Sequence, residues 1–516
     1  MQQELVKKKR EIIDTFLKNG VLISSELLKE IQNDEQANNI FNILKTKKTK
    51  DLVVVGEDFN QIFLMAKERI SSDITIQQAA ETTAEVPPDS LTDRSRIDNV
   101  KIITSYKEDS KKRDPMDFTD YFNVRYKSIE KILKQHQELK ATVSINKIMN
   151  KKDKEAVSII GIVSDRQITK NGNLLLLLED PTGQRRVLIN KNKPTLFNEA
   201  KDIVLDEVIG IVGVNVDTLI FANNVIWPDV PTSKELIKSP QEKYAIFLSD
   251  LHVGSSKFLP EDFEKFLKWI NGEIGNEQQK HIAKNVDYIF IAGDLVDGVG
   301  IYPEQDKELE IKDIYEQYKK CAEYLKQIPS HIPLIICPGN HDAMRISEPQ
   351  PVLSKEYAKP FYEMNNVILV SNPSLININS SENFQGFDVM MYHGYSFDHY
   401  VAEVDSLRNQ GGYDRVDLIM KFLLKRRHLA PTHTSTLYIP DAKKDPLVIE
   451  KVPDFFLSGH IHKSATANYR NTTLICGSCW QGKTAFQEKV GHNPEPSRVP
   501  IVNLQTRDVK ILKFGQ

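Results

Sequence analysis

The sequence predicts a mixed fold, in which a small β-barrel precedes a larger α/β domain and a helical module precedes both. Three patterns in the 516 residues support this prediction. From about 240 to 516, apolar strand-like runs alternate with helical stretches, as in an α/β domain. Between 143 and 232, short strands and tight turns follow one another closely, as in a barrel. Residues 1–70 place apolar side chains at helical spacing.

Composition and charge limit the class of protein. Charged residues make up 27% of the chain and the hydrophobic set 40%, as in a soluble globular protein of several domains. The net charge of -3 gives no overall basic surface, so any grip on nucleic acid needs local patches or a partner. No apolar run reaches the length of a membrane span, and we expect no membrane partner. The N-terminus lacks the apolar core of a secretory signal, and four cysteines suit a reducing, cytoplasmic compartment.

The first 142 residues read as helices joined by a linker. The helical module over 1–70 rests on two apolar faces, formed by Ile12, Ile13, Phe16 and Leu17 and by Leu27, Leu28 and Ile31. Its lysines at 45–51 either touch DNA or form a solvated face. Residues 71–116 are polar and contain prolines, which predicts a disordered linker. Helical spacing resumes over 117–142.

The strand-rich segment over 143–232 predicts an OB-type barrel. Turn signals at Asn171-Gly172 and at 181–183 separate its strands. Barrels of this type often bind single strands by stacking bases on aromatic side chains. Aromatic residues are scarce here, being little more than Phe197, Phe221 and Trp227. We therefore expect a structural or protein-contact barrel rather than a DNA-binding one.

Five apolar runs of the α/β domain each end in residues that bind metals. The runs are YAIFLSDLHVG (Asp250, His252), IFIAGDLVDG (Asp294, Asp297), IICPGNHD (Asn340, His341, Asp342), VMMYHG (His393) and FFLSGHIH (His460, His462). In open α/β sheets, ligands bind at the carboxyl ends of the strands. The shared position of these residues therefore predicts one site.

The types of residue predict which metals the site holds. Oxygen and nitrogen donors without a thiolate suit manganese, magnesium, iron or zinc. The seven predicted metal ligands are Asp250, His252, Asp294, Asn340, His393, His460 and His462. Seven ligands are too many for one ion and fit two ions that share a carboxylate. Two such ions can clamp the attacking and leaving oxygens of a displacement at phosphorus. His341, next to a ligand but spare, is the candidate proton donor to the leaving oxygen.

The remaining candidates have structural alternatives. Asp297 and Asp342 either orient ligands or cap turns. His428 and His433 either support the ligands from behind or lie elsewhere, and the basic run 425–427 either steers DNA, meets a partner or is solvated. A lone C-x-x-C, Cys476 and Cys479, is expected to fill the core rather than to bind zinc. The other histidines are expected to be structural: His136, His281, His331, His399 and His492.

The five motifs D-x-H, G-D-x-x-D, G-N-H-D, H-G and G-H-x-H resemble those of the calcineurin-like metallophosphoesterases, and they occur here in the same order. The resemblance implies a β-sandwich flanked by helices over 240–516. It assigns one metal to Asp250, His252, Asp294 and His462. It assigns the other metal to Asp294, Asn340, His393 and His460. Asp294 then bridges the two metals, and His341 is the catalytic histidine.

Within that superfamily, the chain resembles the small-subunit family of the archaeal D-family DNA polymerases. The order of helical module, linker, barrel and phosphoesterase domain supports this, as do the stretches 423–433 and 447–462. The resemblance implies a manganese-dependent 3′–5′ exonuclease that proofreads a DNA primer 3′ end for a large catalytic subunit. None of the metal motifs is eroded, which favours an active site.

Two other functions stay open. One is a scaffold subunit that tethers the polymerase without catalysis. The other is a different enzyme with the same fold. Phosphoprotein phosphatases carry GDxxDRG and GNHE where this chain has GDLVDGV and GNHD, and a stand-alone nuclease would normally begin with its phosphoesterase domain. The sequence leaves open the strand preference, the subunit stoichiometry, and whether the N-terminal module binds a sliding clamp, the large subunit or neither.

Overall fold

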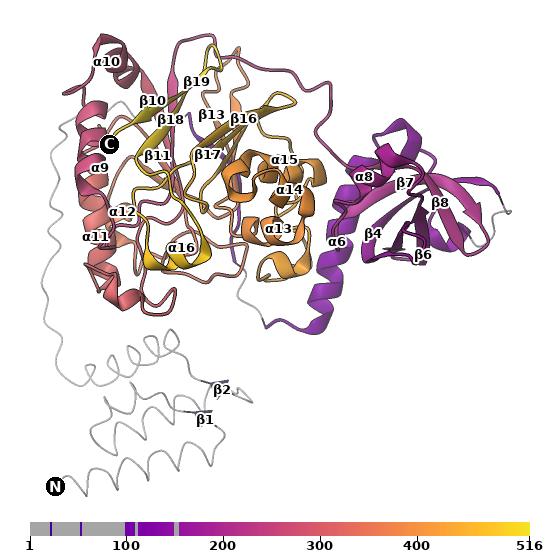
Figure 1. Ribbon diagram of the computed structural model, residues 1–516. Coiled ribbons are helices and arrows are strands. Elements are labelled where there is room, and N and C mark those ends of the chain that lie inside the picture. The colour runs from indigo at the N-terminus through magenta and orange to yellow at the C-terminus, as the bar shows by residue number, and fades with distance from the viewer. Residues whose placement is uncertain (1–20, 23–51, 54–98, 109–111, 149–153, 516) are drawn as a thin grey trace, which may run out of the picture. The chain divides into compact units, whose positions relative to one another are not determined.

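The computed structural model describes residues 21–22, 52–53, 99–108, 112–148 and 154–515 (Figure 1). The chain divides into two compact units, Met1–Asp89 and Ser90–Gln516. In the first unit, β1 (Val21–Leu22) pairs in parallel with β2 (Leu52–Val53). The rest of the predicted helical module and most of the predicted linker lie outside the described residues. Among the described helices, none combines the length and the apolar character that crossing a membrane requires.

The second unit contains a closed barrel of five strands. Its strands are β4 (Ala156–Ile168), β5 (Leu174–Asp180), β6 (Gly183–Ile189), β7 (Val208–Val216) and β8 (Leu219–Ile226), in the order β4-β5-β6-β8-β7. The alternating side chains Leu174, Leu176 and Leu178 point into the barrel and are fully buried, as period-two strands require. Gly172, at the predicted turn, has a φ of 78°, which suits glycine. A short helix, α8 (Pro194–Ala200), joins β6 to β7.

Two six-stranded sheets form the rest of the unit. The first has the order β12-β11-β10-β9-β18-β19, with bounds Val367–Leu369, Leu334–Cys337, Val286–Ala292, Tyr244–Leu248, Arg498–Asn503 and Val509–Lys513. The second has the order β16-β17-β15-β14-β13-β3, with bounds Ala465–Tyr469, Thr472–Cys476, Phe455–Ser458, Phe387–Met391, Ser374–Ile378 and Lys101–Ser105. The strands β9, β10, β11 and β12 run parallel, and so do β14, β15 and β17.

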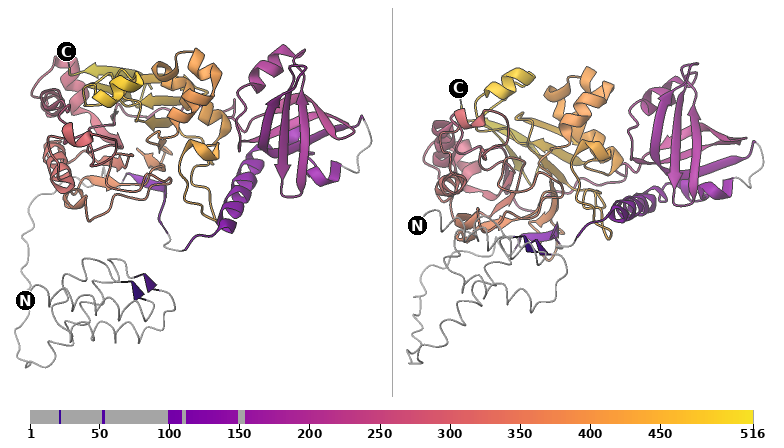
Figure 2. Two further views of the ribbon diagram at one scale, coloured as in Figure 1. Left: turned by 60° about the horizontal axis from the view of Figure 1, so that its bottom comes forward. Right: turned by 90° about the horizontal axis from the view of Figure 1, so that it is seen from below.

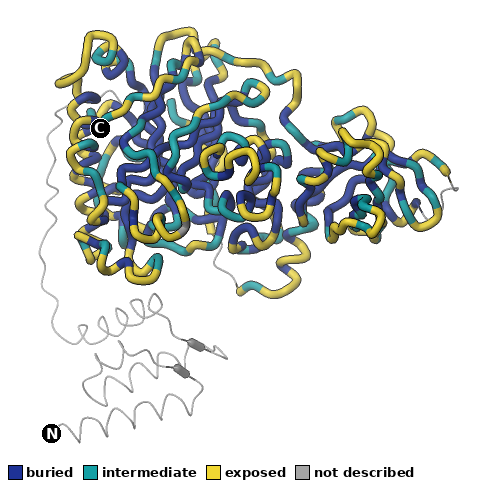
Figure 3. Tube along the Cα trace, viewed as in Figure 1, coloured by how far each residue is buried: buried dark blue, intermediate teal, exposed yellow. Residues whose placement is uncertain are grey.

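The two sheets pack face to face with helices on both outer faces. Phe247 and Phe290 of the first sheet share one buried core with Val389, Phe455 and Leu457 of the second. The outer face of the first sheet is covered by α9 (Pro260–Ile270), α10 (Glu277–Lys284), α11 (Ile314–Leu325) and α12 (Lys359–Tyr362). The outer face of the second is covered by α13 (Phe397–Glu403), α14 (Asp405–Asn409) and α15 (Val416–Arg426). Figures 1 and 2 show these helix groups on opposite sides, and Figure 3 shows the buried strands between them.

The linker prediction is wrong at Lys101–Ser105. This segment forms β3, which pairs antiparallel with β13 at the edge of the second sheet. Side chains secure the pairing, because Ser371 N–H donates to Ser105 Oγ at 3.0 Å and Tyr106 N–H donates to Ser371 Oγ at 2.7 Å. The β-branched residues of the KIITS segment suit a strand, but its partner lies about 270 residues further along the chain.

The predicted helix over 117–142 appears as α6 (Pro115–Leu133), followed by two short turns, η1 (Gln137–Leu139) and α7 (Ile145–Ile148). A capping box formed by Asp114 and Asp117 starts α6, and Pro115 occupies its first turn. One face of α6 packs on the barrel through Ile129 and Leu133. Earlier turns of the helix reach the loop that follows α15. Helix α6 therefore contacts both the barrel and the α/β sandwich.

Candidate metal centre

The predicted ligands all follow strands of the two sheets. Asp250 and His252 follow β9, Asp294 follows β10, and Asn340 with His341 follows β11 in the first sheet. His393 follows β14, and His460 with His462 follows β15, in the second sheet. The carboxyl ends of these parallel strands meet at one edge of the sandwich, so the structure brings all eight residues together. A cavity of about 250 Å³ opens there, and six of the eight line it: His252, Asp294, Asn340, His341, His460 and His462.

The chain turns sharply at five of these residues. Asp250, His252 and Asp294 each have a φ of 52°, and His460 and His462 have φ values of 69° and 57°. Left-handed backbone costs an ordinary residue roughly 1–2 kcal/mol. Backbone hydrogen bonds hold it, because Asp250 N–H donates to the Gly293 carbonyl and His252 N–H to the Asp294 carbonyl, both at 3.0 Å. Strain of this kind is concentrated at functional sites.

One group of ligand atoms comes from Asp250, His252 and His462, all buried. The Nε2 atoms of His252 and His462 lie 3.0 Å apart. Asp250 Oδ1 lies 3.5 Å from His462 Nε2 and 4.0 Å from His252 Nε2. These three residues, with Asp294, are the set that the motifs assign to one metal.

Asp294 also contacts a second group. Its Oδ2 lies 3.7 Å from His252 Nε2 and 3.3 Å from His393 Nε2. His393 Nε2 is in turn 2.9 Å from Asn340 Oδ1. His460 stands beside them, with its ring centroid 5.2 Å from that of His393. Asp294 therefore lies between the two groups, where a bridging carboxylate is required.

The chemistry of this set fits divalent cations. Asp250 and Asp294 are 0% and 1% exposed, and carboxylates so buried need compensating charge. Within the part of the chain that the structure describes, their ion pairs are all with histidines. The backbone also makes room for them. A Cβ on Gly459 would lie 2.5 Å from Asp250 Oδ2, and one on Gly339 would lie 2.2 Å from Asp294 Oδ1.

The pKa shifts show how the centre balances charge through its histidines. Burial acts to raise the pKa of Asp294, but His393, His341 and His252 together hold it well below its usual value. Burial likewise acts to lower the pKa of His393, but Asp294 raises it to about 10. The proton that His393 retains thus supplies positive charge that a cation would otherwise supply. Cations and protons compete for such a site.

Comparisons with known proteins place the chain in a family. The family model for the B subunit of DNA polymerase alpha/epsilon matches residues 245–466, which contain every ligand of the centre. A DNA polymerase II small subunit from Methanothermobacter thermautotrophicus is 34% identical over 506 residues, which cover 98% of this chain and 100% of that protein. The chain belongs to the DNA polymerase II small-subunit family.

Other members of the DNA polymerase II small-subunit family match a shorter part of the chain. The small subunit from Methanocaldococcus jannaschii is 39% identical over 390 residues, which cover 75% of this chain and 64% of that protein. The small subunit from Archaeoglobus fulgidus is 36% identical over 401 residues, which cover 78% of each. The family membership expected from the motifs and their order is therefore confirmed.

His341 lies beside the predicted ligands, and its ring nitrogen falls in one group with His252 and Asp294. Its backbone N–H donates to Asp294 Oδ1 at 2.8 Å, and its Nδ1 lies 2.8 Å from the Asp297 carbonyl oxygen. Nδ1 therefore carries a hydrogen that this carbonyl accepts, and Nε2 is left for another partner. The ring lies 4.6 Å from that of His252, edge to face.

Asp297 and Asp342 support the ligands from behind. Asp297 Oδ1 lies 3.1 Å from His252 Nδ1, and Asp297 also accepts hydrogen bonds from the amides of Gln305 and Gln481. Asp342 accepts from Gly339 N–H at 2.8 Å, and so holds the turn after β11. Their sequence interpretation as orienting or turn-capping residues agrees with these contacts.

Sequence reasoning missed three polar side chains of the centre, Asp398, Gln487 and His492. Asp398 Oδ2 lies 2.9 Å from His460 Nε2, which leaves Nδ1 of that ring for a metal. Gln487 Nε2 lies 2.9 Å from His462 Nδ1. His492, expected to be structural, lines the same cavity. Only Gln487 had a local clue, because Thr484-x-x-Gln487 forms the capping box of α16 (Ala485–Val490).

Among the described residues, the remaining candidates belong to none of the groups that could hold a metal. His428 Nε2 pairs with Asp445 at 2.8 Å, and His433 stacks on Tyr438. Cys476 and Cys479 are buried and form no disulfide, as expected. The basic run 425–427 is not a solvated face, because Arg426 and Arg427 are buried and Lys425 is half-buried. Its members contact Trp227 and Glu207 of the barrel segment and the backbone carbonyls of residues 449 and 450.

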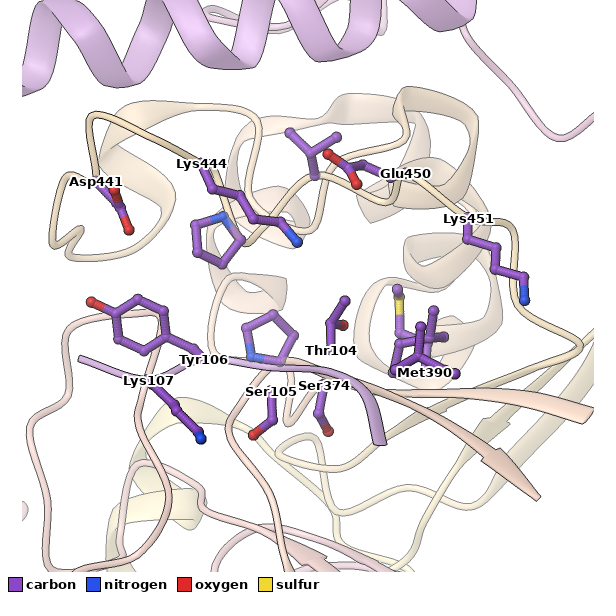
Figure 4. A pocket seen from close by; sticks show the side chains of 15 residues that line it. Thr104, Ser105, Tyr106, Lys107, Ser374, Met390, Asp441, Lys444, Glu450 and Lys451 are labelled. Atoms are coloured by element: carbon purple, nitrogen blue, oxygen red, sulfur yellow. The ribbon is translucent and has the colours of Figure 1, made fainter. Parts of the chain in front are cut away.

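A second cavity, of about 450 Å³, lies over β3 and β13 (Figure 4). Figure 4 shows Lys444 reaching into it from the loop that carries Asp441, Glu450 and Lys451. The eight residues of the metal centre contribute nothing to its lining. This cavity is therefore separate from the candidate centre.

Proposed function

We propose that this chain is the 3′–5′ exonuclease subunit of a two-subunit DNA polymerase. It hydrolyses the terminal phosphodiester of a DNA primer 3′ end and releases a nucleoside 5′-monophosphate. One observation carries the proposal: all seven metal-type donors, with His341, converge at one edge of the sandwich. A subunit that only tethers a polymerase has no need of five strained ligand positions.

The donor set suits two divalent cations. Manganese is the first choice, and magnesium, zinc and iron are the alternatives. Asp250, His252, Asp294 and His462 would hold one cation, and Asp294, Asn340, His393 and His460 would hold the other. When bound, such a pair supplies Lewis-acid stabilisation of the charge that develops on a phosphodiester undergoing displacement. The orienting contacts of Asp297 and Asp398 fix the rings of His252 and His460 for this task.

His341 acts as the general acid. The Asp297 carbonyl accepts its Nδ1–H, so the proton to be transferred is the second proton, which the imidazolium form of the ring carries on Nε2. The leaving atom is the 3′ oxygen of the penultimate nucleotide, and Nε2 protonates it as the phosphorus–oxygen bond breaks. The backbone bond from His341 N–H to Asp294 keeps the ring at a fixed place beside the ligands.

The architecture supports the rest of the assignment. The sandwich of two sheets flanked by helices supports the calcineurin-like phosphoesterase fold that the motifs imply. The closed barrel of five strands, with β6 and β8 parallel, supports the OB-type fold predicted from the sequence. Its Trp227 lies under Lys425 and is 5% exposed, so it offers no face to a base. The large catalytic subunit is the expected partner, and a sliding clamp is a further candidate.

The proposal is tested on the purified full chain with manganese and a primer carrying a 3′ mismatch. We expect laddered shortening of the primer, and its loss in His341→Ala. His281→Ala is the matched control, because that histidine is exposed on α10 and contacts Glu242. If wild type and His341→Ala are equally inert with the large subunit present, the chain is a scaffold. If phosphate is released faster from a phosphopeptide than nucleotide from DNA, the enzyme is a different phosphoesterase.

A further inference from the structure

Aromatic side chains stand beside the ligands in the cavity of the metal centre. Tyr302 and Phe486 line it together with His341, His460 and His462. Their rings are stacked, with centroids 5.4 Å apart and planes at 25°. Phe486 is 45% exposed, which is unusual for a large apolar ring next to buried charge. An aromatic pair that lines a polar cavity and exposes one of its rings is a candidate surface for a flat ligand.

The two rings are held in place by one carboxylate. Glu308 accepts a hydrogen bond from Tyr302 Oη at 3.1 Å and another from the backbone N–H of Ala485 at 3.0 Å. Ala485 begins helix α16, which carries Phe486 as its next residue. Glu308 therefore connects the loop that carries Tyr302 to the helix that carries Phe486.

The same helix connects the aromatic pair to the ligands. Gln487, which follows Phe486, places its Nε2 2.9 Å from His462 Nδ1. Its Oε1 accepts from Thr484 N–H at 3.1 Å, so the amide is fixed at both ends. On the other side, the Tyr302 ring lies 6.3 Å from the His341 ring. The aromatic pair therefore lies next to His341 and His462, where the proposed function puts the phosphodiester to be cleaved.

We propose that Tyr302 and Phe486 form a stacking surface for the base of the 3′-terminal nucleotide of single-stranded DNA. The inference rests on the proposed exonuclease function and names the form of its substrate. Stacking on aromatic rings accepts any base, because every base has a π face, which suits a nuclease that must remove all four. A base can reach the rings only when it is out of the duplex. Moving the terminal base out of the duplex costs less free energy at a mismatched 3′ end than at a paired one. The aromatic pair therefore favours mismatched ends.

The test uses binding, not turnover. A single-stranded oligonucleotide with 2-aminopurine at its 3′ end is titrated with the full chain at low salt in EDTA, where nothing is hydrolysed. We expect the wild-type protein to quench the fluorescence through stacking. Phe486→Ala should bind about tenfold or more weakly, Phe486→Trp should retain quenching, and Phe486→Leu should not. Thermal denaturation of each variant in the same buffer checks that it is folded.

A matched control exists on α11. Tyr315 stacks on Tyr357 with centroids 5.3 Å apart and planes at 26°, and it is 47% exposed, but it does not line the cavity. Tyr315→Ala should quench like the wild type. Absence of quenching by the wild type, equal quenching by Phe486→Ala, or equal loss in Tyr315→Ala each overturns the inference.

The outcome separates the two proposals. If manganese supports primer shortening but Phe486→Ala shortens mismatched and paired ends with the wild-type ratio, the stacking surface is wrong and the exonuclease stands. If the wild type quenches through Phe486 but shortens no primer, the stacking surface stands and the exonuclease fails. If both proposals hold, Phe486→Ala should lower the preference for mismatched ends several-fold, and an abasic 3′ end should remove the difference from wild type.

Discussion

Five predicted ligands adopt left-handed backbone conformations that side chains other than glycine disfavour. His462 illustrates this, because its φ of 57° suits glycine and yet its imidazole is buried against His252. The G-H-x-H motif in the sequence predicted that His462 is a ligand. It could not predict the strain, because the sharp turn is enforced by neighbours that arrive from other strands. The sequence could not predict the role of Asp398 either, because that role follows from its contact with His460 in the folded chain.

Substitution of His462 should reveal that strain. We expect His462→Gly to be more stable than His462→Ala by about 1 kcal/mol in metal-free protein, because only glycine adopts this φ without cost. Chemical denaturation of both variants measures the difference. Thr466, in strand β16, provides the reverse comparison, since glycine in a strand should be the less stable substitution. Equal stability of the His462 pair would mean that the backbone is not strained there.

Glu348 gives a dependence on pH. The residue is fully buried and accepts a hydrogen bond from Tyr392, and burial raises its pKa from 4.5 to about 7. The folded state therefore keeps a proton that the unfolded state loses, so stability falls as pH rises from about 4.5 to about 7 and then levels off. Glu348→Gln removes this loss. In metal-free protein its stability relative to wild type should rise between pH 5 and pH 8, by up to about 3 kcal/mol. An unchanged difference across that range contradicts the assignment.

At the scale of elements, buried charge fastens α6 to the sandwich. Asp445, in the loop after α15, accepts hydrogen bonds from Tyr121 at 2.7 Å and Arg125 at 2.8 Å, both on α6. His428 donates to it as well, because its Nδ1 accepts from Ala430 N–H and burial beside Arg125 lowers its pKa to about 4, so the ring is neutral. The helix was predictable from its apolar face. Its attachment was not, because the partners lie about 320 residues apart.

Loss of this carboxylate should be costly. Asp445→Asn leaves Arg125 buried without a countercharge, which typically costs about 3–5 kcal/mol. Thermal and chemical denaturation measure the loss. Asp120→Asn, an exposed position on the same helix, is the control and should change stability by less than about 0.5 kcal/mol. A loss no greater than the control's would show that solvent reaches the pair.

Sequence reasoning located a strand correctly where one short run carried both the strand and the predicted ligands. The run YAIFLSDLHVG shows the buried strand β9 and the ligands Asp250 and His252 together. It failed where pairing is decided at a distance. The segment KIITS became the strand β3 only because β13 offers it an edge, and the run 425–427 became an internal contact only because the barrel lies against it. The aromatic pair of Tyr302 and Phe486 likewise arises from a loop and a helix far apart in sequence.

At the scale of the whole second unit, the centre draws its ligands from both sheets. Metal binding should therefore stabilise the entire sandwich. We expect manganese to raise the melting temperature of EDTA-treated protein, with a gain of about 2.7 kcal/mol for each site at a hundredfold excess over its dissociation constant. His393→Ala and Asp250→Asn, one in each sheet, should both reduce the gain, and His281→Ala should keep it. A gain that survives both ligand variants would place the ion elsewhere.

Each sheet of the sandwich supplies only part of the predicted ligand set, so a cation bound there would link the two sheets across their interface. A small shift of one sheet relative to the other would change the distances from the cation to all the ligands of that sheet at once. A ligand that binds at the edge of either sheet and shifts it would therefore change the affinity for the cation. By thermodynamic linkage, cation binding would change the affinity for that ligand by the same factor.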